Sequence, residues 1–209
     1  MGGCVAQLAA LNAPDLVRKL ILLGTIPSTG EGVVRADLGP FNQLASAVSE
    51  DEQQAAFVET FFTNSETSQA AGKAAWERIS NARKDRVEHV PVKNAKKQGA
   101  AFANFMNRKL AKEASYDRFE ELQLPVLIAN GKLHQLCSLQ VKSSNRYLGS
   151  DDVLLPTPNS IVMWQKLKHI KAQLHLFPDS GHGFLFQYAD DLAKLINDFL
   201  DRPEKPSRL

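Results

Sequence analysis

The chain has 209 residues, of which 44% are hydrophobic and 23% are charged, and its formal net charge is +2 at pH 7. This length suits one domain, or one domain with a small subdomain, and the composition is typical of a soluble globular protein. The small charge excludes a nucleic-acid partner recognised by a basic stripe, and no apolar run reaches the ~18 residues of a membrane span.

The first 27 residues predict a helix and then a buried strand. Residues 1–13 carry apolar side chains at near-helical spacing, and Pro14 ends that pattern. Residues 19–23 are expected to form a strand, because Leu20 to Leu23 are a short apolar run that stops at Gly24. Such a run is typical of a strand covered on both faces, as in a parallel sheet.

The next stretch, residues 28–117, has a different character. Glycine and proline up to Pro40 predict loops, and helices are expected at about 41–62, 67–84 and 92–109. Three aromatic side chains are expected to pack one face of the first helix as core, and these are Phe57, Phe61 and Phe62.

Strands and helices alternate again after residue 117. Strands are expected at 124–131 and 173–177, and helices at 157–168 and 187–201. Parallel strands joined by helices place the chain in the α/β class. The expected organisation is a core of residues 1–27 and 118–209, with residues 28–117 inserted as a helical cap.

The first four residues, Met1-Gly2-Gly3-Cys4, admit two interpretations. They are similar to a lipidated N-terminus, but Ala6 stands where acylation favours Ser or Thr. The second interpretation is a nucleophile elbow. In serine members of the α/β-hydrolase family the elbow reads Gly-x-Ser-Met-Gly-Gly and continues into a helix and a strand, and this chain resembles that pattern from Met1 onward. The resemblance implies that Met1 follows the nucleophile and holds the oxyanion position.

A second stretch, Gly149 to Pro156, resembles the acid loop of the same family. The family often places its acid four residues before a proline. That match implies Asp152 as the acid, with Asp151 as the alternative.

The third stretch, Phe177 to Phe184, resembles the family's histidine loop after the last strand. Only His182 lies between glycines in such a loop, which implies that it is the catalytic histidine. The other four histidines lack this setting and are expected to be non-catalytic, namely His89, His134, His169 and His175.

Together the three stretches imply acyl transfer on a small molecule, an ester, lactone or similar carbonyl compound. A serine would attack the carbonyl, His182 would accept its proton, and Asp152 would hold the imidazole. Family members with an aspartate nucleophile, such as the dehalogenase-like and epoxide-hydrolase-like ones, are disfavoured by the Met-Gly-Gly pattern.

The chain has no Gly-x-Ser-x-Gly motif. We therefore expect the nucleophile, five strands and an oxyanion loop before Met1, a stretch of roughly 80–110 residues. The chain by itself is expected to be inactive. The alternative is a non-catalytic fragment or pseudoenzyme that serves as a binding module.

Residues 132–149 separate Gly131 from Ser150, where the family has a short loop. Joining those two residues restores an ordinary acid loop, and the ends of the segment can be encoded as splice donor and acceptor sequences. The hypothesis is a translated intron, and the alternative is a surface insertion.

No cofactor is expected. A nucleotide-binding glycine loop is absent, and His134 and Cys137 have no further metal ligand nearby in the sequence. Two cysteines, Cys4 and Cys137, imply no disulfide framework, so a cytoplasmic location is expected. The sequence does not predict the oligomeric state.

Overall fold

A computed structural model describes residues 1–82, 92–132 and 152–203. Its strands are β1 (Leu20–Leu23), β2 (Val126–Lys132) and β3 (Gln173–Pro178). Its α-helices are α1 (Gly2–Asn12), α2 (Leu38–Ser46), α3 (Glu50–Phe61), α4 (Glu66–Asn81), α5 (Val92–Phe105), α6 (Pro158–Lys166), α7 (Phe184–Gln187) and α8 (Ala189–Leu200). Three short 3-10 helices are η1 (Pro14–Leu16), η2 (Arg108–Leu110) and η3 (Tyr116–Glu121).

The three described strands form one parallel sheet in the order β1-β2-β3. Leu22 of β1 pairs with Ile128 of β2, and Asn130 of β2 pairs with Leu176 of β3. The α/β class and the parallel strands expected from the apolar runs are thus confirmed. Because the strands are parallel, their carboxyl ends meet at one edge of the sheet.

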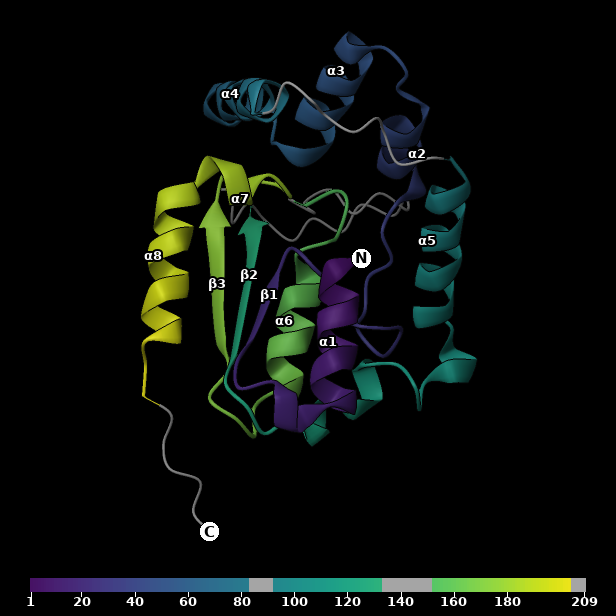
Figure 1. Cartoon of the computed structure of the whole chain (residues 1–209), viewed down its shortest axis with the longest axis vertical. Coiled ribbons are helices and arrows are strands. Elements are labelled where there is room, and N and C mark those ends of the chain that lie inside the picture. The colour runs from purple at the N-terminus through teal and green to yellow at the C-terminus, as the bar shows by residue number, and fades with distance from the viewer. Residues whose placement is uncertain (83–91, 133–151, 204–209) are drawn as a thin grey trace, which may run out of the picture.

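Helices cover both faces of the sheet (Figure 1). Helices α1 and α6 pack on one face, where Leu22 and Ile128 are fully buried with Met163 of α6. Helix α8 covers the other face, where Leu192 packs with Ala129 and the aromatic side chains of the β3 end. The helix expected over 187–201 is α8, and it is amphipathic, since Leu192, Leu195 and Ile196 all belong to this cluster.

Helices α2 to α5 come between β1 and β2 in the sequence, and α3 and α4 lie beyond the carboxyl ends of the strands (Figure 1). Two expectations about them were wrong. The helix expected over 41–62 is two helices, because Ser49 starts α3 with a capping box to Glu52. Helix α2 already begins at Leu38 under an Asp37 cap, so Pro40 lies in its first turn, where proline is tolerated.

The aromatic side chains of α3 are core, as expected. Phe57 and Phe62 are buried, and the ring centroid of Phe57 lies 5.6 Å from that of Trp76 on α4. Phe186 of α7 joins the same cluster, with its ring centroid 5.7 Å from that of Phe57. This cluster therefore joins the α3–α4 pair to the segment that follows β3.

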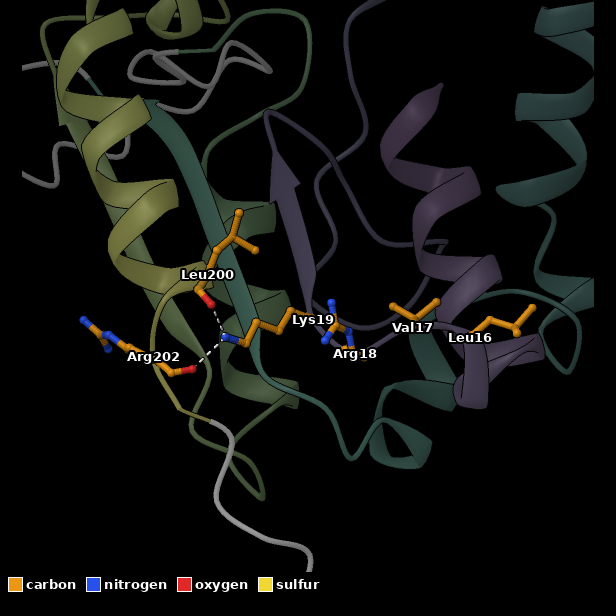
Figure 2. Close-up of a pocket in the computed structure, with 6 residues that line it drawn as sticks. All are labelled: Leu16, Val17, Arg18, Lys19, Leu200 and Arg202. Atoms are coloured by element: carbon orange, nitrogen blue, oxygen red, sulfur yellow. Dashed lines mark hydrogen bonds between the residues drawn. The ribbon is translucent and has the colours of Figure 1, made fainter.

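A hollow of about 660 Å³ lies at the opposite end of β1, between residues 16–19 and the end of α8. Figure 2 shows the Lys19 ammonium turned toward the last carbonyls of α8. Its Nζ donates to the carbonyl oxygens of Phe199, Leu200 and Arg202 at 3.2, 2.5 and 2.7 Å. A cation at a helix C-terminus is favourable, so Lys19 ties the start of β1 to α8.

Among the described residues, no helix is long and apolar enough to span a bilayer.

The two glycines that open α1 have different surroundings, which gives a matched test of the fold. A Cβ on Gly3 would overlap the Thr25 side chain after β1, whereas a Cβ on Gly2 would meet nothing within 4 Å. We expect Gly3→Ala to lower the free energy of unfolding by about 1–3 kcal/mol, the usual cost of overpacking. Gly2→Ala is expected to change it little. Urea unfolding of the two variants measures the difference, and equal midpoints would contradict this packing of α1.

Candidate functional site

Two predicted site residues lie together at the carboxyl edge of the sheet. The Nδ1 atom of His182 is 2.7 Å from the Oδ2 atom of Asp152, although the residues are 30 positions apart. His182 follows β3, and Asp152 belongs to the connection from β2 to α6. Adjacent parallel strands thus bring a carboxylate and an imidazole into hydrogen-bond contact.

The Asp152 carboxylate is fully buried and hydrogen-bonded at both oxygens. Its Oδ1 atom accepts from the backbone N–H groups of Leu154 and Leu155, at 3.0 and 2.8 Å. These two bonds form a tight turn around Oδ1, and Oδ2 contacts the imidazole. A buried carboxylate needs such partners, because an unpaired one would be very costly.

Two further polar residues fix this turn against the end of β2. Asn130 is fully buried, and its Nδ2 donates to the Leu155 carbonyl and to Ser160 Oγ, both at 3.3 Å. Thr157 Oγ1 donates to the Gly131 carbonyl at 2.8 Å. Sequence reasoning missed both residues. The available signal was an asparagine at the end of an otherwise apolar strand, where a side chain must find buried partners.

Glycines allow the histidine loop to approach two strands. A Cβ on Gly131 would overlap the carbonyl oxygens of Ser180 and Gly181, so the end of β2 lies directly against that loop. Gly24, after β1, has a φ of +50°, and a Cβ there would lie 3.0 Å from Cε1 of His182. Both its backbone conformation and the space beside the imidazole favour glycine at position 24.

The third predicted site residue, Met1, lies at the same edge. It is the N-cap of α1 and is 45% exposed. The first turn of α1 contacts Thr25 through Gly3, and Thr25 follows Gly24, which contacts His182. The start of α1 thus packs against a residue that is adjacent in sequence to a neighbour of the imidazole.

The other ring nitrogen of His182, Nε2, has no hydrogen-bond partner among the described residues. The ring is 18% exposed, and the edge of Phe61 packs against it with ring centroids 5.1 Å apart. One ring nitrogen is therefore hydrogen-bonded to a carboxylate, and the other has no partner in residues 1–82, 92–132 and 152–203. This is the arrangement of an imidazole that can take up a proton from a neighbouring group.

The remaining candidates take no part in this site within the described structure. His169 Nε2 lies 2.8 Å from the Leu122 carbonyl oxygen, and His175 is exposed on β3. Cys4 is 5% exposed, and burial raises the pKa of its thiol, which keeps it protonated and disfavours it as a nucleophile. Four candidates lie outside the described residues, and these are Asp151, His89, His134 and Cys137.

The segment suspected as an intron, residues 132–149, lies outside the described residues except for Lys132, the last residue of β2. Within residues 1–82, 92–132 and 152–203, no group of three or more His, Cys, Asp or Glu side chains could hold a metal ion.

Comparison with known proteins gives a family and a fold. A family model described as the alpha/beta hydrolase fold matches residues 1–189. No curated protein matches the chain. Among solved structures, the chain is similar to an alpha/beta hydrolase fold protein from Chitinophaga pinensis, at 24% identity and a TM-score of 0.71 over 96% of this chain.

Two other solved structures are more distant. A 2-hydroxy-6-oxo-6-phenylhexa-2,4-dienoate hydrolase from Rhodococcus sp. strain RHA1 is 16% identical over 97% of this chain, with a TM-score of 0.58. A protein described as a putative non-heme bromoperoxidase from Mycobacterium tuberculosis is 14% identical over 95%, with a TM-score of 0.59. The chain spans 62% of the first two proteins and 63% of the third. At these identities the likeness shows the fold.

The parallel sheet, its helices on both faces and the family match over residues 1–189 all agree. The chain belongs to the α/β-hydrolase fold family.

Proposed function

We propose that this chain supplies the base and the acid of a serine hydrolase that acts on an ester, lactone or similar carbonyl substrate. The observation that carries the proposal is the 2.7 Å contact between His182 Nδ1 and Asp152 Oδ2. Among the described residues, Nε2 of the same imidazole has no hydrogen-bond partner. The family match supports a hydrolase in general.

The proposed reaction proceeds through an acyl-enzyme. Nε2 of His182 accepts the proton of a serine hydroxyl while the serine oxygen attacks the carbonyl carbon. The protonated imidazole then donates that proton to the leaving oxygen as the carbonyl–oxygen bond breaks. Water, activated by the same Nε2, hydrolyses the acyl-serine. Asp152 holds the proton on Nδ1 and stabilises the transient imidazolium.

The proposed nucleophile is a serine that precedes Met1 in the complete reading frame. Support comes from two packing contacts, that of Gly3 with Thr25 and that of Gly24 with His182. A residue before Met1 is therefore proposed to lie at the carboxyl edge of the sheet. In that longer chain the Met1 nitrogen would be an amide, and its N–H would be one donor to the oxyanion.

The cap expected over residues 28–117, which contains α2 to α5, is proposed to shield the reaction from water. Helices α3 and α4 lie beyond the strand ends (Figure 1). The ring of Phe61 on α3 packs against the imidazole, with ring centroids 5.1 Å apart. An apolar wall at this point suits a substrate whose carbonyl carries an apolar group. The proposed substrate is a small molecule.

The test begins with the DNA upstream of the Met1 codon. We expect it to encode Gly-x-Ser directly before Met1, preceded by several strand and helix units. The protein translated from that frame, called here the extended protein, should hydrolyse p-nitrophenyl esters, whereas the 209-residue chain should not, because the nucleophile and its oxyanion donors carry most of the acceleration.

Two results would contradict the proposal. One is an unrelated sequence or a stop codon immediately before Met1. The other is ester turnover by the 209-residue chain that survives purification and disappears in the His182→Ala variant. An extended protein that folds but binds small molecules without turnover would favour the alternative, a binding module.

A further inference from the structure

The loop that carries His182 is tied to the junction between α3 and α4 by hydrogen bonds. The Asp179 carboxylate accepts from Thr63 Oγ1 at 2.8 Å and from Ser65 Oγ at 2.6 Å. These hydroxyls are more than 110 positions away in the sequence, and they come from the segment proposed as the cap. The carboxylate is therefore shared by two parts of the fold.

Further hydrogen bonds join the histidine loop and α7 to the same junction. The Asp179 carbonyl accepts from Gln187 Nε2 at 2.8 Å, and Gln187 Oε1 accepts from Ser68 Oγ at 2.8 Å. The backbone N–H of Gly183 donates to the Phe61 carbonyl at 2.6 Å. The residues on both sides of His182 are thus held by the end of α3 and the start of α4.

Asp179 itself is in an unusual conformation. Its φ of +44° makes it the only non-glycine residue with positive φ in the described part of the chain. Aspartate tolerates this region better than most residues, but the conformation persists only where surrounding contacts hold it. Here those contacts are the hydroxyls of Thr63 and Ser65 and the amide of Gln187.

We propose that Asp179 is a positioning residue for His182, and that its bonds to Thr63 and Ser65 make the His182–Asp152 hydrogen bond depend on the α3–α4 junction. The meaning for catalysis rests on the proposed function. The structural coupling does not, because it concerns the imidazole and its hydrogen bond in the chain as it stands.

Two variants distinguish a role of Asp179 in positioning His182 from a role in forming its own backbone turn. Asp179→Gly removes the carboxylate but suits the positive φ, so it relieves the backbone while breaking the bonds to the junction. Thr63→Val keeps the side-chain shape and removes one donor. If Asp179 served only to make the turn, neither variant would alter His182.

The measurement is NMR of the imidazole Nδ1 proton of His182 in the ¹⁵N-labelled 209-residue chain. His169 provides an internal control, because its Nε2 lies 2.8 Å from the Leu122 carbonyl oxygen, at a site that none of these contacts includes. Thr63→Val should speed the exchange of the His182 proton with water by about tenfold, the factor that loss of one hydrogen bond represents. Asp179→Gly removes the bonds to both Thr63 and Ser65 and should speed the exchange by at least as much. The His169 signal should stay unchanged.

Unchanged exchange at His182 in both variants would overturn the proposal. Loss of both histidine signals together, even in Thr63→Val, would also overturn it, since the carboxylate would then be a determinant of folding. A second experiment uses the extended protein. In it, Asp179→Gly should lower kcat by a similar factor and leave KM little changed. An extended protein without activity, combined with the expected NMR result, would refute the proposed function and leave the coupling in place.

Discussion

Replacing Asp152 with asparagine should lower kcat of the extended protein toward p-nitrophenyl esters by about 10⁴-fold, the loss typical of a triad acid changed to its amide. The substitution preserves shape, and Oδ1 can still accept from the N–H groups of Leu154 and Leu155. At the Oδ2 position, however, an NH₂ group would face Nδ1 of His182. The neutral imidazole would then carry its proton on Nε2, which could no longer act as a base.

The matched control is Asp15→Asn. Asp15 is exposed in η1, which precedes β1 and so lies at the end of that strand away from the imidazole. It should leave kcat within a factor of two or so, as is usual for surface substitutions. In the 209-residue chain, Asp152→Asn should also remove the NMR signal of the His182 Nδ1 proton. Activity retained within tenfold in Asp152→Asn would show that this carboxylate is not the acid.

Gly131→Ala should lower the free energy of unfolding by about 3 kcal/mol, at the upper end of the usual cost of overpacking. The added Cβ would overlap two carbonyl oxygens of the histidine loop, at Ser180 and Gly181. These are backbone atoms, so no side-chain rotation relieves the overlap. Either β2 must move against β3, with which Gly131 pairs, or the histidine loop must withdraw.

Gly99→Ala is the control for this prediction, because a Cβ there would meet nothing within 4 Å and the residue is exposed on α5. An alanine in an exposed helix should stabilise the chain by about 0.5–1 kcal/mol. Urea unfolding measures both variants. A Gly131→Ala variant as stable as the parent chain would mean that the histidine loop does not lie against the end of β2.

The sequence predicted β1 and β2 well because each contains a short run of apolar residues, and β2 is buried on both faces. The strands expected at 19–23 and 124–131 became β1 and β2, as is typical of short apolar runs in a parallel sheet. The division between α2 and α3 was missed, because apolar spacing continues across it. Ser49 and Glu52, a capping box three residues apart, were the overlooked signal.

The candidate site was predictable only through resemblance. Nothing in composition or periodicity relates Asp152 to His182 across 30 residues, and it was the acid and histidine loops of a known family that paired them. Their roles are still predictions. The contact between Thr63 and Asp179 could not be foreseen at all, because both are polar residues in loops, and only the folded chain brings positions 116 apart together.

The anchoring of the Asp152 turn has a consequence for how this gene can change. Residues that follow Asp152 hold the turn to β2, through the hydrogen bonds of Leu155 with Asn130 and of Thr157 with Gly131. The position of the Asp152 carboxylate therefore depends on the number of residues between Asp152 and Thr157. An in-frame insertion or deletion between these two residues would separate the carboxylate from its anchors on β2, and with them from His182.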